Sequence, residues 1–252
     1  MNYDLLLQTI LDVGEEMVVA GAEVSRVEDS VERMCEAYDM TRVNVFIIVS
    51  NLQVTVETPE GRILTQIRRI VRNDVNFDRI DYLNDLSRTI CADKPDVEEM
   101  KRLLEEVMNR PQQSRLLGII GSICTASGFT IFFNGSVMDG VAAAVMAVVI
   151  VFFNKLIGAR EKNMIALSFI VSMIAGLCAI ALVRMHIGEN VNVIMMGGIM
   201  LLIPGIAMTN AVRDMLTGDT ASGLLRLANS LLIAASIACG FAIAIVLAGG
   251  VL

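Results

Sequence analysis

The segment from residue 204 to residue 226, PGIAMTNAVRDMLTGDTASGLLR, places ionisable residues inside an otherwise apolar part of the chain. Asn210 and Asp214 are four residues apart, so on a helix they share one face. Arg226 could hold a carboxylate by paired hydrogen bonds, while Asp214 or Asp219 could titrate or bind an amine. Because charges are costly within membrane spans, this pattern predicts a binding or translocation site for a small charged molecule.

The same segment contains residues that favour irregular backbone, namely Pro204, Gly205 and Gly223. Proline removes one helical hydrogen bond and clashes with the preceding turn. Irregular backbone at membrane depth is tolerated where it is buried in protein or lines a cavity. We therefore predict a helix break at Pro204–Gly205 and a second, polar break over GD at 218–219 and SG at 222–223, which includes Gly223. The polar ends of a broken helix pair would then converge, as in many transporter sites.

A structural interpretation of this segment stays open. In it, residues 212–222 form a cytoplasmic loop, Asp219 caps the last helix and Arg226 snorkels to the interface. Asp139, at the start of another apolar run, is equally ambiguous because a position near the interface can be hydrated. We keep Asp139 among the candidate translocation residues, since a charge within a span is a functional hypothesis by default.

Other kinds of site have no support in the sequence. There is no glycine-rich phosphate loop, nucleophile elbow or metal-binding cluster. The five cysteines are scattered and lack C-x-x-C spacing, which favours reduced thiols without a metal or disulfide role. We predict a protein that is not an enzyme and that uses no catalytic residue, cofactor or metal.

Two regions of different composition must position these residues. Residues 1–113 carry 13 Lys+Arg and 22 Asp+Glu, whereas residues 114–252 carry only 7 and 5. From Leu116 onward the apolar runs approach the roughly 20 residues that cross a bilayer as a helix. We predict a soluble domain over 1–113 and a transmembrane domain over 114–252. Spans are expected near 116–134, 137–157, 164–184, 191–211 and 225–249, with the fourth either spanning fully or re-entrant.

Loop charges predict the orientation of these spans. The basic residues cluster in the loops that share a side with the N-terminal domain: Arg115, Lys155, Arg160, Lys162 and Arg213. The positive-inside rule then places that domain in the cytoplasm. The acidic balance and the absence of a basic stripe argue against nucleic acid as a partner.

The first 113 residues change their hydrophobic period twice, from helical spacing to alternation and back. Helices followed by strands and further helices predict an antiparallel three-stranded sheet with helices on one face. The fold class expected is a multi-pass α-helical membrane protein with an N-terminal cytoplasmic α+β domain. Helices are expected over 4–20, 22–38, 76–91 and 96–109, and strands around 43–49, 54–56 and 62–70.

The second expected helix begins in the motif GAEVSRVEDSVERM, which contains Gly21, Ser25, Arg26 and Glu28. This motif resembles the entry motif of the N-terminal domain of the threonine/serine exporter (ThrE) family. TPEGRILTQIRRI and VNFDRIDYLNDLSR resemble its following strand and helix. The matching residues there are Thr65, Arg69, Asn76 and Asn84.

The membrane region extends the resemblance over nearly the whole chain. GFTIFFNGSVMDG, with Asp139, is similar to the family's first hairpin between spans. Residues 204–226 resemble the most distinctive stretch of the family. This resemblance favours the functional interpretation of that segment. The matching residues are Pro204, Gly205, Asn210, Asp214, Gly218, Asp219, Ser222, Gly223 and Arg226.

The resemblance implies a multi-pass protein of the cytoplasmic (inner) membrane. It would export a small amino acid (threonine or serine) or a small carboxylate (succinate), coupled to the proton gradient. Full-length members carry about ten spans, so this chain resembles the larger subunit of a split, two-component exporter. A small multi-span membrane partner similar to the family's C-terminal half is then expected, and a homo-oligomer stays open. An arginine with two aspartates suits an amino acid better than a dicarboxylate.

A second hypothesis is a membrane-anchored sensor or assembly module whose cytoplasmic domain binds a ligand or partner. The size of that domain and its Arg26/Glu28 cluster support this hypothesis. Against it, a lone anchor needs one span rather than five with polar breaks. The Arg26/Glu28 cluster could equally be a solvated or intradomain ion-pair network.

Overall fold

The computed structural model describes residues 2–48, 50–72, 75–111, 114–161 and 163–249. The chain forms two compact units, each of which is described by itself. Unit 1 comprises Met1–Gln112 and Ala207–Leu227, and unit 2 comprises Gln113–Ile206 and Ala228–Leu252. The predicted boundary lies between residues 113 and 114, and residue 113 is outside the described part of the chain.

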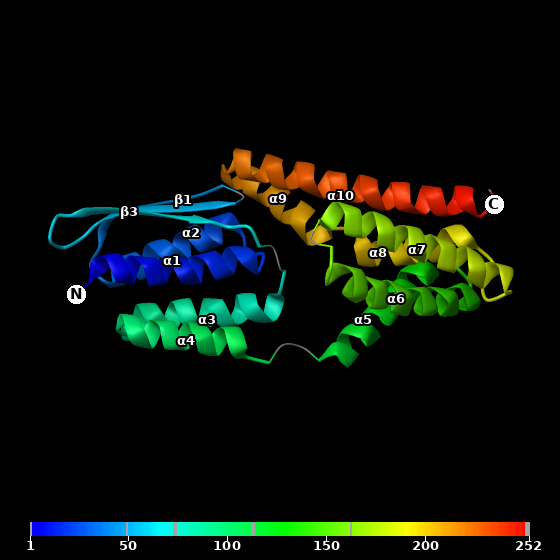
Figure 1. Ribbon diagram of the computed structural model, residues 1–252, viewed down its shortest axis with the longest axis horizontal. Helices are drawn as coiled ribbons and strands as arrows, with labels where there is room; N and C mark the ends of the chain where they lie inside the picture. The colour runs from blue at the N-terminus through cyan, green and yellow to red at the C-terminus, as the bar shows by residue number, and fades with distance from the viewer. Residues whose placement is uncertain (1, 49, 73–74, 112–113, 162, 250–252) are drawn as a thin grey trace. The chain divides into compact units, whose positions relative to one another are not determined.

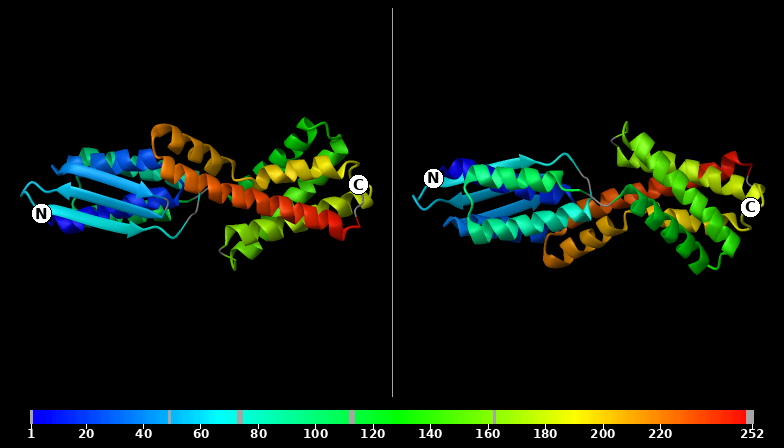
Figure 2. Two further views of the ribbon diagram at one scale, coloured as in Figure 1. Left: turned by 90° about the horizontal axis from the view of Figure 1, so that it is seen from above. Right: turned by 90° about the horizontal axis from the view of Figure 1, so that it is seen from below.

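Unit 1 contains the predicted order of two helices, three strands and two helices. The strands form an antiparallel sheet in the order β1-β2-β3, as expected from the alternating pattern. The sheet, the pair α1 and α2, and the pair α3 and α4 form three successive layers (Figures 1 and 2). The elements are α1 (Tyr3–Val19), α2 (Val24–Ala37), β1 (Thr41–Ile48), β2 (Asn51–Glu57), β3 (Ile63–Arg69), α3 (Phe77–Asp93) and α4 (Val97–Asn109).

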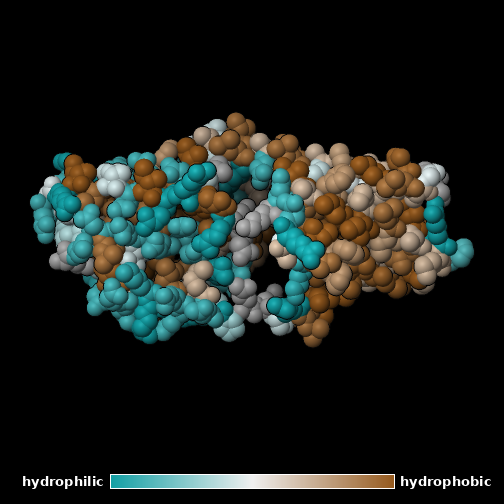
Figure 3. All heavy atoms as spheres, in the orientation of Figure 1, coloured by the Kyte–Doolittle hydropathy of each residue, from teal (hydrophilic) through white to brown (hydrophobic). Residues whose placement is uncertain are grey.

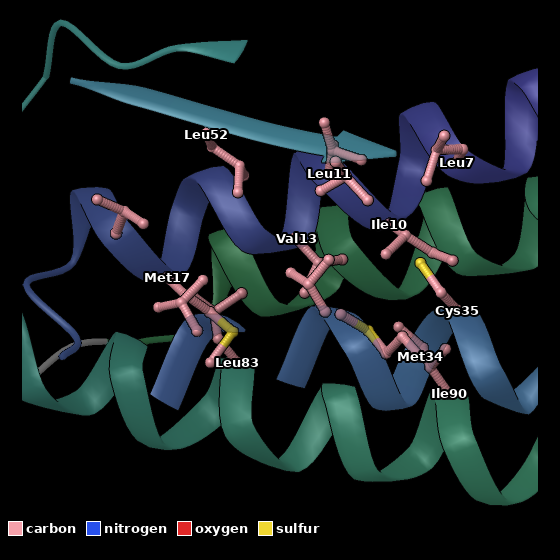
Figure 4. Packing of buried hydrophobic residues seen from close by; sticks show 14 of the residues in the cluster. Leu7, Ile10, Leu11, Val13, Met17, Met34, Cys35, Leu52, Leu83 and Ile90 are labelled. Carbon is pink, nitrogen blue, oxygen red and sulfur yellow. The ribbon is translucent and has the colours of Figure 1, made fainter. Parts of the chain in front are cut away.

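The core of unit 1 lies between the sheet and the two helical layers. Figure 4 shows α1 side chains such as Leu11 and Met17 packed among Leu52 of β2, Met34 of α2 and Leu83 of α3, all buried. Apolar residues at helical spacing bring one face of α1 against the sheet and another against α3 and α4. Burial of this apolar surface supplies the main driving force for folding unit 1.

The turns of unit 1 explain two residues of the N-terminal motifs. Gly21 has a φ of +91° between α1 and α2, a conformation that suits glycine because a Cβ strains it. Asn76 is the N-cap of α3, where its side chain accepts a hydrogen bond from the backbone N–H of Arg79 at 3.0 Å.

Unit 2 is a bundle of long apolar helices. Four described helices are long and apolar enough to cross a membrane: α5 (Arg115–Phe132), α6 (Val137–Gly158), α7 (Met164–Arg184) and α10 (Thr220–Leu247). Of α10, the residues from 228 onward belong to unit 2. The visible surface of this bundle is mainly hydrophobic in Figure 3. Large apolar side chains such as Phe132 and Phe152 remain exposed on it, as lipid-facing residues would.

The fourth predicted span is divided into two helices. α8 (Val191–Leu202) ends just before Pro204, and α9 (Gly205–Thr217) begins directly after it. The two helices meet at a bend of 57°, and counting them as one broken span raises the number of candidate spans from four to five. The chain is thus a multi-pass α-helical membrane protein whose unit 1 contains a small three-stranded sheet.

The second expected break, over GD at 218–219 and SG at 222–223, is found at the first of these two pairs. The helix is interrupted at Gly218, which has a φ of +109°, and Gly223 lies inside the regular helix α10. A serine–glycine pair weakens helix propensity but does not by itself end a helix that is held by packing.

Candidate functional site

A helical hairpin formed by α9 and the start of α10 carries most of the predicted site residues. The turn at Gly218 reverses the chain, and the backbone N–H of Asp219 donates to the carbonyl of Asp214 at 2.9 Å. Thr217 also directs its hydroxyl to the Asp214 carbonyl, at 3.1 Å. Both bonds go to the Asp214 carbonyl, which the end of α9 would otherwise leave without a partner.

Gly223 allows the two helices of the hairpin to approach closely. A Cβ at this position would lie 2.6 Å from the carbonyl oxygen of Ala211 and 2.9 Å from the backbone nitrogen of Met215. Both atoms belong to the backbone, so a larger residue would force the helices apart. The sequence signal at Gly223 was therefore real, but its physical meaning is close helix packing.

Asp214 and Arg226 form a buried pair within this hairpin. Asp214 is only 1% exposed, and its Oδ2 lies 3.6 Å from Nη1 of Arg226, whose side chain is 18% exposed. The same Oδ2 accepts no hydrogen bond from the residues that the structure describes. Burying a carboxylate oxygen without a hydrogen bond costs free energy, unless a solvent molecule or a ligand donates one to it.

Two contacts join the hairpin to the N-terminal elements of unit 1. The buried hydroxyl of Ser222 donates to the carbonyl of Ile47 in β1 at 3.0 Å. Nη1 of Arg213 lies 2.7 Å from Oε1 of Glu23, which immediately precedes α2. Glu23 and Ile47 were not predicted as site residues, since no local pattern in the sequence links either of them to the hairpin.

Glu28 extends the acidic character of this region from α2. Its Oε1 accepts a hydrogen bond from the backbone N–H of Ile47 at 3.0 Å. Burial raises the pKa of Glu28, and the nearby carboxylates of Asp219 and Asp214 raise it further. The carboxylate of Glu28 thus belongs to the same electrostatic environment as the two aspartates of the hairpin.

Comparison with known proteins places this arrangement in a family. The ThrE model, described as a putative threonine/serine exporter, matches residues 8–248, which include both the α2 motif and the hairpin. The chain belongs to the threonine/serine exporter family. No solved structure matches it.

Two curated relatives of the threonine/serine exporter family differ in length. A protein of Mycobacterium tuberculosis named "Probable threonine/serine exporter" is 25% identical over 251 residues, covering 96% of this chain and 47% of the relative. A protein of Klebsiella aerogenes named "Probable succinate transporter subunit YjjP" is 26% identical over 237 residues, covering 91% of this chain and 88% of the relative. The chain thus spans about half the length of the first relative.

The remaining exporter-family motif residues lie in different surroundings. Asn210 is half-buried on α9, one turn before Asp214. Ser25 lies in the first turn of α2, and Arg26 is exposed on that helix. Arg26 and Glu28 do not form a pair among the described residues, because Glu28 binds β1 while Arg26 lines a separate cavity.

Asp139 lies in unit 2, where it organises a loop. It forms a capping box with Ser136 at the start of α6: its Oδ2 accepts from the Ser136 N–H, and the Ser136 hydroxyl accepts from the Asp139 N–H. Its Oδ1 accepts from the backbone N–H groups of Glu189 and Asn190, at 2.7 and 3.0 Å. Asp139 thereby ties the start of α6 to the loop before α8.

The donor atoms for a metal are not assembled in the described part of the chain. No group of three or more His, Cys, Asp or Glu residues there lies close enough to hold a metal ion. What the hairpin offers is one guanidinium beside a buried carboxylate, with Asp219 and Glu28 nearby.

Proposed function

We propose that this chain is the larger subunit of a two-component secondary-active exporter for threonine, serine or a small carboxylate such as succinate. Membership of the threonine/serine exporter family and the names of the two relatives support this assignment. The relative named as a transporter subunit, 88% of which is covered by the match to this chain, supports the subunit arrangement.

The observation that carries the proposal is the loose pair of Asp214 and Arg226. Their charged atoms are 3.6 Å apart, and Oδ2 of Asp214 accepts no hydrogen bond from a described residue. A structural ion pair at this degree of burial normally needs additional hydrogen bonds to offset desolvation. A carboxylate oxygen with unused acceptor capacity, such as Oδ2 of Asp214, is instead suited to bind a ligand.

A zwitterionic amino acid matches the charges of the hairpin. Its carboxylate would accept hydrogen bonds from two N–H groups of Arg226, because the planar guanidinium fits a carboxylate. Its ammonium group would donate a hydrogen bond to Oδ2 of Asp214, which accepts none from the described residues. A dicarboxylate would place a second negative charge beside Asp214 and Asp219, so it would require protonation there or cations from a partner.

Proton coupling is assigned to the acidic groups around the hairpin. Glu28 faces Asp219, Asp214 and Glu32, and burial and these carboxylates together raise its pKa. Such a group can take up a proton when the neighbouring aspartates are ionised and release it when a cationic ligand arrives. We assign Asn210 and Asp139 supporting roles, Asn210 on the face of α9 and Asp139 in loop positioning.

The chain would cross the membrane several times and act together with a membrane partner. We place unit 1's N-terminal elements in the cytoplasm and the helices of unit 2 in the inner membrane, following the loop charges. The partner is a small multi-span membrane protein resembling the second half of longer family members. Its helices would complete the translocation path.

Efflux from preloaded membrane vesicles tests the site. The chain is co-expressed with its membrane partner, and release of radiolabelled threonine, serine and succinate is compared for Asp214→Asn, Asp219→Asn and Arg226→Gln. We expect the Asp214 and Arg226 variants to lose at least about 90% of the efflux, about 1.4 kcal/mol or more of barrier. Arg213→Gln is the matched control, since it removes an exposed charge from the same helix as Asp214.

Membrane insertion is measured in the same preparations by fractionation and protease accessibility. Full efflux in all three site variants would refute the assignment of the hairpin as the substrate site. Loss of efflux in the Arg213→Gln control to the same degree would show that the hairpin acts only through its packing on the rest of unit 1.

A further inference from the structure

Unit 1 contains a second polar feature, which shares no residue with the hairpin. A cavity of about 430 Å³ opens between α2 and α3. This volume lies within the range of about 300–1,000 Å³ that is usual for small-molecule sites. Its polar lining includes Arg26, Ser30 and Arg33 of α2, and Asn84, Ser87 and Arg88 of α3.

Helical spacing explains how these side chains reach one cavity. On α2, Arg26 and Arg33 lie four and three positions from Ser30. On α3, Ser87 and Arg88 lie three and four positions from Asn84, so each set shares a helix face. α2 and α3 pack side by side through Met34, Leu83 and Ile90, as Figure 4 shows. The polar groups therefore converge on the cavity from two rigid elements.

The charge of the cavity is opposite to that of its surroundings. Residues 1–113 carry 22 acidic against 13 basic residues, yet the cavity is lined by three arginines and a single acidic residue, Asp29. An excess of guanidinium groups in a concave site raises the local concentration of anions. The lining is thus electrostatically suited to a ligand with more than one negative charge.

The three arginines differ in how readily they could bind such a ligand. The guanidinium of Arg26 makes no hydrogen bond or ion pair with the residues that the structure describes. Arg33 pairs with Asp29 at 2.9 Å, and both side chains are more than half exposed. Arg88 pairs with Asp85, which lies on the same helix and outside the cavity lining. Exposed pairs of this kind contribute little and exchange easily.

Asn84 adds a buried polar group to the wall of the cavity. It is 7% exposed, and its side-chain amide makes no hydrogen bond within the described part of the chain. The nearby Ser87 hydroxyl donates to the backbone carbonyl of Asn84 at 2.8 Å and so holds the local helix geometry. The amide atoms are not among the buried side-chain atoms that lack a partner, so solvent or a ligand in the cavity can reach them.

We propose that the cavity between α2 and α3 binds a small, multiply charged oxyanion, such as a phosphorylated or dicarboxylate metabolite. Arg26 makes the first contact, Arg33 and Arg88 exchange their exposed carboxylate partners for the ligand, and the Asn84 amide donates from the buried wall. The site is separate from the export site, so its binding does not depend on transport.

Isothermal titration of the full chain in detergent tests this proposal. The buffer is free of phosphate and carboxylate, and the probes are inorganic phosphate, pyrophosphate, succinate and acetate. We expect saturable binding of at least one multivalent probe, with acetate at least about tenfold weaker. Arg26→Gln should weaken the binding about tenfold or more, as expected for the loss of a charge-assisted hydrogen bond.

The controls separate a binding role from a folding role. Arg102→Gln removes an exposed arginine of α4 outside the cavity and should leave the affinity unchanged. Ser30→Asp should abolish binding by placing a carboxylate one turn from both Arg26 and Arg33. Circular dichroism and gel filtration verify that each variant is folded.

The relative affinities of the phosphate probes and succinate identify the ligand class. The proposal is overturned if none of the multivalent probes saturates at millimolar concentration. It is equally overturned if folded Arg26→Gln and Ser30→Asp bind the probes as the unmodified chain does.

Discussion

Two buried aspartates, one in each unit, have nearly the same exposure and opposite surroundings. Asp139 of unit 2 is 2% exposed and accepts three backbone hydrogen bonds, from Ser136, Glu189 and Asn190. Asp214 of unit 1 is 1% exposed, and its Oδ2 accepts none from the described residues. Burial alone therefore does not distinguish a structural carboxylate from one available to a ligand.

The difference lies in how much of the hydrogen-bonding capacity is used. The Asp139 carboxylate is held by fixed backbone dipoles, which stabilise its charge and order the loop before α8. Asp214 relies on a loose ion pair with Arg226 and keeps acceptor capacity. We therefore expect substitutions of Asp139 to act mainly on stability and substitutions of Asp214 mainly on transport.

The largest effect on stability is expected for Asp139→Ala. This change leaves three backbone N–H groups without their acceptor and removes the capping box of α6. We expect unit 2 to lose about 3–5 kcal/mol. Hydrogen–deuterium exchange of peptides from α6 and the 185–190 loop, measured on the full chain in detergent, should show this loss.

Asp139→Asn is the milder substitution at this position. The carbonyl oxygen of the asparagine can still accept hydrogen bonds from the backbone N–H groups of Glu189 and Asn190. A smaller loss than for Asp139→Ala is expected. If Asp139→Ala exchanged as slowly as the unmodified chain while efflux disappeared, Asp139 would join Asp214 as a transport residue.

A double-mutant cycle on Asp214 and Arg226 is expected to give the next largest effect. Arg226→Gln leaves the buried carboxylate without its cation, which we expect to cost about 2–4 kcal/mol in unit 1. Asp214→Asn should cost less, and the double variant should recover part of the loss. Hydrogen exchange of α9 peptides provides the measurement.

Additive losses in this cycle would contradict the pairing. They would mean that Asp214 and Arg226 contribute independently, and Asp214 would then resemble Asp139 as a structural residue.

Gly223→Ala tests the packing that positions Asp214. The added Cβ would collide with backbone atoms of Ala211 and Met215, so we expect a loss of about 1–3 kcal/mol in the hairpin and reduced efflux. Gly118→Ala in α5 is the matched control. No heavy atom of the described residues lies within 4 Å of its added Cβ, and the helix propensity of alanine should make it neutral or slightly stabilising.

The smallest effect is expected for Glu28→Gln, and it depends on pH. Burial and Asp219 raise the pKa of Glu28 above 4.5, so between 4.5 and that raised pKa the folded state binds more protons than the unfolded state. Stability contributed by this group therefore falls as the pH rises through that window. The substituted glutamine would be uncharged and could still accept from the Ile47 N–H.

We expect Glu28→Gln to be slightly more stable than the unmodified chain near neutral pH, with the advantage lost near about pH 4.5. Thermal unfolding followed by circular dichroism at both pH values measures the difference. An advantage that persists unchanged at low pH would show that charge at Glu28 is not its cause.

Much of the fold could be predicted from local pattern. Helical and alternating periodicity depend on residues a few positions apart, so they located the four helices and three strands of the N-terminal region. Pro204 marked the break before α9, because proline cannot continue a helical hydrogen-bond ladder. Apolar runs of sufficient length identified the membrane helices.

The sequence by itself determined the elements, the membrane class and the family motifs, since all three depend on composition or short-range spacing. Only the tertiary structure showed that the hairpin of residues 207–227 packs with α2 and β1 in unit 1. The contacts responsible, Arg213 with Glu23 and Ser222 with Ile47, join residues 190 and 175 positions apart. No local pattern encodes such pairs, because they arise only when separate elements bury their surfaces together. The surroundings of the two aspartates also depend on the tertiary structure. Folding brings backbone N–H donors to Asp139, but none of the described residues donates to Oδ2 of Asp214.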